Sequence, residues 1–172
     1  MISVIVGTNR ENNVTKRVAE LVDEILSEKL KNHDVLHLEN LPGNFIFNNI
    51  YTGEMSKELE ETAHRYVASA DKFIFLIPEY NGSFPGVLKA FVDSVDPALF
   101  KNKKALLIGL SAGRAGNVRG LDHFTGVLHY LKTTVYPFKF AIPGVENQIS
   151  DENQKNVLKQ KLSELVEDFL NF

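Results

Sequence analysis

The stretch FIFLIPEYNGSFPGVLKAFV, residues 73–92, decides the fold that this sequence predicts. It opens with five consecutive apolar residues, which are typical of a strand buried on both faces of a parallel sheet. Pro78 cannot donate a hydrogen bond to a neighbouring strand, and a polar loop follows it. Pro85 then stands where a helix would begin. Strand, loop and helix in this order are the building unit of an α/β protein.

The same unit recurs along the chain. Strands are predicted at 2–6, 34–38, 72–77, 104–110 and 133–142, and helices at 14–31, 55–70, 84–95, 118–131 and 152–170. The second strand is short and mixed and the fifth contains Pro137, which suits two edges. Edges around three buried strands match the flavodoxin-like order 2-1-3-4-5. We therefore expect an α/β, flavodoxin-like three-layer sandwich with a five-stranded parallel sheet, formed by residues 1–172 as a single domain.

One long segment, residues 39–53, matches neither pattern and is expected to be a surface loop. Phe45, Ile46 and Phe47 are unusually apolar for such a loop. We expect these three side chains to cover the core. The alternative is that they cover a partner subunit or a ligand.

The composition is that of an ordinary globular protein, with 44% hydrophobic and 24% charged residues and a net charge of −3. So mild a charge argues against a nucleic-acid partner held by a broad basic surface. The absence of cysteine excludes disulfides and cysteine nucleophiles. No apolar run is long enough to cross a membrane and the first residues do not resemble a signal peptide, so we expect a cytoplasmic protein without membrane association. The five histidines show no metal-ligand spacing, and no metal site is predicted.

Two loops at the ends of predicted strands carry unusual polar residues, and ligands of open α/β sheets bind at such ends. The loop GTNRENNVT, residues 7–15, precedes a helix whose first N–H groups favour an anion such as phosphate. Thr8, Asn13 and Thr15 can donate hydrogen bonds to that anion, and Arg10 adds a charge. An equally open alternative is that asparagine only caps the helix and the arginine is solvated.

The loop SAGRAGN, residues 111–117, follows the fourth predicted strand. Its glycines allow backbone to approach a ligand closely, and Arg114 favours an anion. The alternative is a flexible turn without a ligand. The sequence between 78 and 85 forms a third such loop, in which a large aromatic residue, Tyr80, stands between polar neighbours.

Together the three loops resemble the NADPH-dependent FMN reductase family of the flavodoxin-like superfamily, which has azoreductase and quinone reductase relatives. PEYNGSFPGVLK, residues 78–89, resembles the family segment P-E-Y-N-G-S-x-P-G-x-L-K almost letter for letter. The first loop resembles G-S-x-R-x-x-S-x-N less closely, because Thr8, Asn13 and Thr15 replace serine, serine and asparagine. The loop after the fourth strand resembles S-x-G-x-x-G-G, with Asn117 at the final glycine.

The resemblance implies bound FMN, NADPH or NADH as co-substrate, and transfer of a hydride to the flavin followed by transfer of electrons to a small-molecule acceptor such as flavin, a quinone or an azo compound. It implies three groups of cofactor-binding residues: Thr8, Arg10, Asn13, Val14 and Thr15 at the phosphate, Pro78, Glu79, Tyr80, Asn81 and Gly82 along the ring, and Ser111, Gly113 and Arg114 approaching it from the other loop. No side chain is required as acid, base or nucleophile, so no catalytic residue is predicted. The family also implies a homodimer or homotetramer.

Two other functions remain open on the sequence. A flavodoxin-like electron carrier would bind FMN without oxidising NAD(P)H, and a flavin-free binding module would keep only the fold. The preference between NADPH and NADH and the identity of the acceptor are equally open.

Overall fold

The computed structural model describes residues 1–30, 32–53 and 55–172. Its centre is a parallel sheet in which the strands follow the order β2-β1-β3-β4-β5, with β6 also paired to β4. The strands are β1 (Ile2–Val6), β2 (His33–His37), β3 (Lys72–Pro78), β4 (Lys104–Leu110), β5 (Thr134–Val135) and β6 (Phe140–Ile142). The flavodoxin-like order predicted from the sequence is confirmed.

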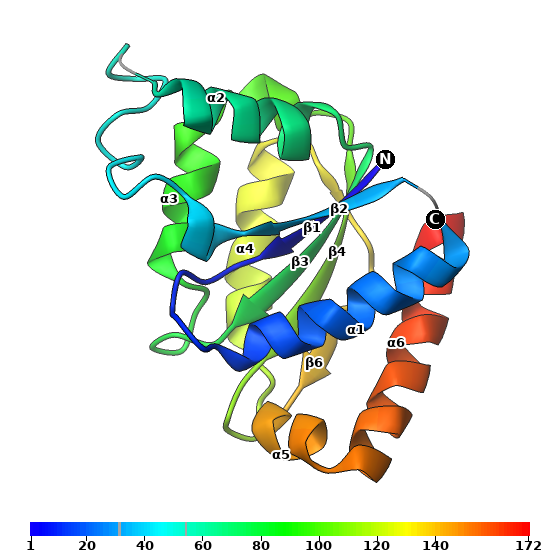
Figure 1. Ribbon diagram of the computed structural model, residues 1–172. Coiled ribbons are helices and arrows are strands. Elements are labelled where there is room, and N and C mark those ends of the chain that lie inside the picture. The colour runs from blue at the N-terminus through cyan, green and yellow to red at the C-terminus, as the bar shows by residue number, and fades with distance from the viewer. Residues whose placement is uncertain (31, 54) are drawn as a thin grey trace.

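Helices cover both faces of the sheet (Figure 1). On one face lie α1 (Val14–Lys29), α5 (Val145–Ser150) and α6 (Glu152–Asn171), and on the other α2 (Lys57–Ala63), α3 (Gly86–Ser94) and α4 (Val118–Tyr130). Along β3, Ile74 packs toward α1 and α6, whereas Phe75 packs toward α2, α3 and α4. Because successive strand side chains point to opposite faces, burial on both faces requires the continuous apolar runs seen in the sequence.

The prediction of one continuous strand at 133–142 is wrong. The structure has β5 and β6 separated by residues 136–139, because Pro137 lacks the N–H that a continuous ladder would use. Both short pieces still pair with β4, at its beginning and at its end. The edge position predicted for this segment is therefore right, and its continuity is not.

Three further details differ from the expectations. The helix predicted at 55–70 is shorter and continues as a π-helical turn, η2 (His64–Ala68), and α5 was not predicted. The loop after β2 begins with the short turn η1 (Leu38–Asn40), and of the three residues predicted to cover the core, Phe45, Ile46 and Phe47, only Phe45 does so. Ile46 and Phe47 are 49% and 74% exposed. Among the described residues, no helix combines the length and the apolar composition that crossing a lipid bilayer requires.

Candidate functional site

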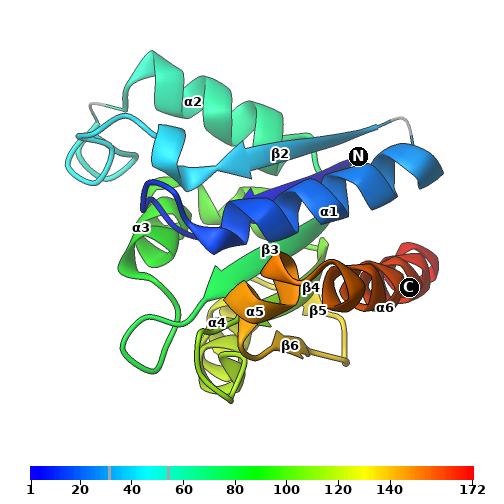
Figure 2. The same cartoon turned by 60° about the horizontal axis from the view of Figure 1, so that its bottom comes forward.

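The loops after β1, β3 and β4 leave the same edge of the sheet, because all three strands are parallel. The loops after β1 and β3 can be followed at the left of Figure 2. Hydrogen bonds tie the loops after β3 and β4 together: the N–H of Glu79 donates to Leu110 O at 2.8 Å, and Asn117 Nδ2 donates to Ile77 O at 3.0 Å. The loop after β1 is joined to β3 by the N–H of Gly7, which donates to Leu76 O at 2.9 Å. The segments that sequence reasoning selected are thus neighbours in the fold.

The loop after β1 begins with Gly7, whose position leaves no room for a side chain. A Cβ there would lie 2.9 Å from Leu76 O on the neighbouring strand. Thr8 follows and is 1% exposed. Its Oγ1 accepts a hydrogen bond from the N–H of Arg10 at 3.2 Å and lies 2.6 Å from the hydroxyl oxygen of Tyr80. When Tyr80 donates, both lone pairs of Oγ1 are occupied and the Thr8 proton is left for a third group.

The start of α1 is organised by Asn13. Its Oδ1 accepts from the N–H of Lys16 at 2.9 Å, and its Nδ2 donates to Arg10 O at 2.6 Å. The capping role that the sequence left open is therefore present, and the side chain serves to order the loop. The amides of Val14 and Thr15 lie in the first turn, where N–H groups have no acceptor within the helix and the helix dipole is positive.

The charged side chains beside this loop differ in whether they already have a partner. Lys16 pairs with Glu39 at 2.9 Å, and the hydrogen bond to Glu39 raises the pKa of Lys16 above its usual 10.5. Burial lowers the pKa of His37 below 6.5, and the nearby positive charge of Lys16 lowers it further, so this ring is neutral at pH 7. Arg10 is exposed, and its guanidinium carbon is 5.8 Å from the centroid of the Tyr80 ring. Within the described chain Arg10 forms no ion pair, which leaves its charge for a ligand.

The loop after β3 contains a tight reverse turn that the letters Tyr-Asn-Gly-Ser encode. Tyr80 and Ser83 exchange two backbone hydrogen bonds, at 2.9 and 3.0 Å. Asn81 and Gly82 both have positive φ, 51° and 75°, as a type I′ turn requires. In the described chain the N–H groups of Glu79 and Tyr80 have backbone acceptors, whereas those of Asn81 and Gly82 have none. This turn places the Tyr80 ring over the loop after β1.

The loop after β4 is shaped by its own side chains. Ser111 Oγ donates to Gly113 O at 3.0 Å and accepts from the N–H of Gly116 at 2.9 Å. Gly113 O also accepts from the N–H of Gly144 at the start of α5, at 2.9 Å. Asn117 has φ 65°, a left-handed conformation that asparagine tolerates better than most residues, which explains how it replaces the family glycine. Arg114 is exposed and has no ion pair or side-chain hydrogen bond among the described residues.

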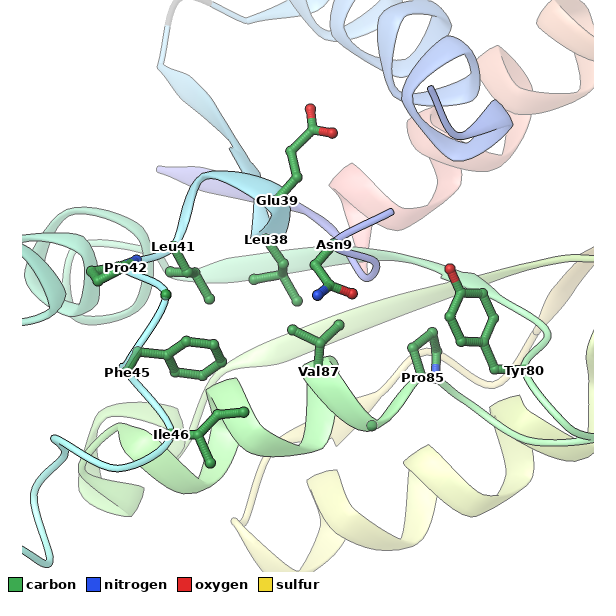
Figure 3. Close-up of a pocket in the computed structure, with 12 residues that line it drawn as sticks. Asn9, Leu38, Glu39, Leu41, Pro42, Phe45, Ile46, Tyr80, Pro85 and Val87 are labelled. Atoms are coloured by element: carbon green, nitrogen blue, oxygen red, sulfur yellow. The ribbon is translucent and has the colours of Figure 1, made fainter. Parts of the chain in front are cut away.

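A pocket of about 460 Å³ opens beside Tyr80, between the loop after β1, the segment after β2 and the start of α3 (Figure 3). Its lining consists of Asn9, Leu38, Glu39, Leu41, Pro42, Gly43, Phe45, Ile46, Tyr80, Pro85, Gly86 and Val87. Apart from Tyr80, sequence reasoning did not assign these residues to the cofactor site. The signal that pointed here was the apolar group at 45–47, for which covering a ligand was the open alternative.

Comparison with known proteins identifies the family. Residues 1–147 match the family model of the NADPH-dependent FMN reductases. The chain belongs to this family. The resemblance found in the three loops is thereby confirmed, and the match extends over most of the chain.

Individual relatives fit the same assignment. The chain is 28% identical over 137 residues to a 2-hydroxy-1,4-benzoquinone reductase of a Burkholderia species, covering 76% of this chain and 70% of that protein. It is 29% identical, over an alignment of 199 positions that includes gaps, to an FMN-dependent NADH:quinone oxidoreductase of Macrococcus caseolyticus, covering 95% of this chain and 92% of that protein. The fold resembles that of a flavoenzyme NAD(P)H:(acceptor) oxidoreductase of Paracoccus denitrificans, with TM-score 0.74, 20% identity and coverage of 96% and 94%.

Proposed function

We propose that this protein is an FMN-dependent NAD(P)H oxidoreductase that passes electrons to a small-molecule acceptor. The observation that carries the proposal is the group of donors at the start of α1, joined through the Thr8–Tyr80 hydrogen bond to the loop after β3. Family membership supports the same cofactor chemistry.

The donor set fits the phosphate of FMN. The proton of Thr8, the amides of Val14 and Thr15 and the charge of Arg10 all suit a phosphate dianion at a helix N-terminus. Asn13 contributes by capping the helix and holding the loop. The positive end of the α1 dipole favours a dianion at this position.

For the flavin ring we propose the segment Pro78–Gly82, with Ser111, Gly113 and Arg114 contributing from the loop after β4. When bound, FMN would accept a hydride from NADPH or NADH and deliver electrons to the acceptor. The type I′ turn fixes Tyr80 and leaves the N–H groups of Asn81 and Gly82 for a polar edge of the ring. Fixed N–H donors of this kind favour negative charge without reorganising during a reaction. No side chain of the protein has to transfer a proton in this scheme.

The first test is the absorbance spectrum of the purified protein, supplied with FMN, before and after anaerobic addition of NADPH or NADH. We expect bound flavin whose absorbance is bleached by the nicotinamide. Flavin that stays oxidised would instead favour an electron carrier, and protein that ignores added FMN would favour a flavin-free module.

The second test is the variant Arg10→Ala. A hydrogen bond to a charged group contributes about 1.5–3 kcal/mol, so FMN should bind about 10- to 100-fold more weakly. Arg17→Ala is the matched control, because Arg17 lies in α1 and its guanidinium already donates to Ile149 O at 3.1 Å. Equal FMN affinity in the wild type and Arg10→Ala would place the phosphate elsewhere.

We also propose that residues 1–172 act as one cytoplasmic domain that assembles into a homodimer or homotetramer. Exposed aromatic side chains support an assembly, because Tyr51 and Tyr130, 73% and 87% exposed, line one cavity of about 450 Å³ with residues of α3 and α4. Light scattering after gel filtration tests this: a monomer at micromolar concentration would contradict it.

A further inference from the structure

We infer that Arg119 and His123 of α4 are positioning residues for the flavin ring, and that their positive charge raises the reduction potential of bound FMN. This role rests on the proposed function, because it requires FMN beside the turn at residues 80–83. Neither residue belongs to the three loops that carry the proposed cofactor site.

The two side chains contact neighbouring residues of that turn. A Cβ at Gly82 would lie 2.9 Å from a guanidinium nitrogen of Arg119, so this group lies against the turn. His123 follows one helical turn later on the same face of α4, and its Nδ1 is 2.9 Å from Ser83 Oγ. A serine hydroxyl can donate to a bare Nδ1 and accept from a protonated one, so this contact suits both charge states of the ring.

The contact at Ser83 is transmitted to the residue that the site depends on. Ser83 and Tyr80 exchange two backbone hydrogen bonds, at 2.9 and 3.0 Å. Phe84, which follows Ser83, packs on Phe124 of α4, with the ring centroids 5.3 Å apart. Phe124 is fully buried, so this part of α4 is anchored in the closely packed core. The turn is therefore held by a rigid element.

Arg119 brings a positive charge that is not compensated by an ion pair. Within the described part of the chain, its guanidinium forms neither a salt bridge nor a side-chain hydrogen bond. Asp122, the acidic residue between Arg119 and His123, is paired with Lys139 at 2.6 Å, and this hydrogen bond lowers the pKa of Asp122. Glu79 lines a cavity of about 280 Å³ together with Arg119. It forms no ion pair with Arg119 among the described residues, so the guanidinium remains available to a charge that develops at the turn.

The charged groups that face His123 from α3 compensate each other. Lys89 and Asp93 line a cavity with His123 and are themselves 2.7 Å apart. Tyr51 and Tyr130 line the same cavity and contribute hydroxyl groups. Histidine is the side chain whose charge ordinarily changes between about pH 5 and pH 8. The positive charge beside the turn therefore increases as the pH falls.

Hydride transfer creates the negative charge on which these groups act. NAD(P)H gives up a hydride and becomes NAD(P)⁺, so the flavin ring gains two electrons, one proton and one unit of negative charge, and no other reagent is needed. Under the proposed function the N–H groups of Asn81 and Gly82 face this charge. Arg119 and His123 contact the same turn. Preorganised positive charge favours the more negative form, so the ring is reduced more readily.

The test compares the midpoint potential of FMN bound to the full-length wild type and variants, by anaerobic equilibration with a reference dye at about pH 6 and about pH 8. Arg119→Gln should make reduction about tenfold less favourable, which lowers the potential by about 30 mV for two electrons. Arg119→Lys, which keeps the charge, should restore most of this difference. His123→Gln should make reduction about threefold less favourable at the lower pH, or about 15 mV, and have a smaller effect at the higher pH.

His129→Gln is the matched control, because His129 is exposed on α4 but does not line the cavity beside His123. Its potential should equal that of the wild type at both pH values. Where a variant binds FMN too weakly for a direct titration, the ratio of its affinities for reduced and oxidised FMN gives the same difference in potential.

Potentials of Arg119→Gln and His123→Gln that equal the wild-type value at both pH values would overturn this role and leave the proposed function intact. Equal losses in Arg119→Gln and Arg119→Lys, or a shift in His123→Gln that does not depend on pH, would show packing effects without a role of charge and would also overturn it. Wild-type protein that binds no FMN would overturn the proposed function together with this inference.

Discussion

Replacing Tyr80 with phenylalanine removes one hydroxyl and the hydrogen bond that joins the loop after β1 to the turn after β3. In the wild type the two oxygens are 2.6 Å apart, and Thr8 is 1% exposed. In the variant, Thr8 Oγ1 keeps the N–H of Arg10 as a partner at 3.2 Å, so the buried oxygen is not orphaned. The substitution therefore isolates the link between the two loops.

The expected magnitude follows from that count of bonds. One neutral hydrogen bond contributes about 1 kcal/mol to stability, so Tyr80→Phe should lower Tm by about 2–4 °C in a chain of this length. Thr8→Val has nearly the same shape but removes two bonds, and should cost about 2 kcal/mol. The double variant loses the shared bond only once. Its total cost should stay near that of Thr8→Val, which gives a coupling energy of about 1 kcal/mol.

The same change should affect the cofactor. Without the Tyr80 hydroxyl, the Thr8 proton is free to turn away from the phosphate, and we expect FMN to bind about fivefold more weakly. Thr8→Val, which has no proton to donate, should weaken binding further.

The four proteins are compared without FMN by urea unfolding followed by far-UV circular dichroism, because the chain has no tryptophan. FMN affinity is measured separately by quenching of flavin fluorescence. The slope of the unfolding free energy with urea should be the same in all four, since the folded surface does not change. Stability effects that add to within about 0.3 kcal/mol would show that the two hydroxyls do not interact, and would refute the reasoning.

Three further predictions concern the packing of β4, the turn after β3 and the pKa of His37. Gly109→Ala would place a Cβ 2.2 Å from Gly116 O and should lower the free energy of unfolding in urea by about 1–3 kcal/mol. Gly126→Ala, where a Cβ would have no neighbour within 4 Å, is the control and should stabilise α4 by up to about 1 kcal/mol. Equal stabilities of the two variants would contradict the close approach at Gly109. Gly82→Ala, at φ 75°, should lower the free energy of unfolding by about 1–2 kcal/mol, and an unchanged Tm would argue against the type I′ turn. His37 binds its proton more weakly in the folded state, so the free energy of unfolding should fall as the pH drops from 6.5 toward the lowered pKa of His37. His37→Gln should remove this dependence on pH. An identical dependence of stability on pH in the variant and the wild type would exclude the effect.

The layers and the strand order were predictable because the signal is local and strong. β3 and β4 are uninterrupted apolar runs buried on both faces, and few other environments accept such runs. The edges were predictable for the opposite reason: β2 is mixed in polarity, and Pro137 cannot donate to a central ladder. The Asn-Gly pair also carried its own geometry, although its pairing of Tyr80 with Ser83 was not predicted.

The rest depends on contacts between distant segments. Thr8 and Tyr80 are joined only after β1 and β3 have paired, so neither loop alone indicates their hydrogen bond. The pocket beside them takes one wall from the segment after β2 and another from α3, and no local pattern relates these two. Phe45 is buried whereas its neighbour Ile46 is exposed, although both are large apolar residues. The difference arises from how the loop packs on the core, which the sequence of the loop does not indicate.

Both borders of the sheet are poor templates for an incoming strand. At the β2 border, Asp34 forms two hydrogen bonds of 2.9 Å with Arg65, so charge stands beside the outermost strand. At the other border, Pro137 separates two short strands, and no long row of backbone groups is presented there. A sheet whose interior strands are strongly apolar would otherwise invite edge-to-edge aggregation at high concentration. Straightening residues 136–139, for example by replacing Pro137 with valine, should therefore reduce the solubility of the protein even if its stability rises.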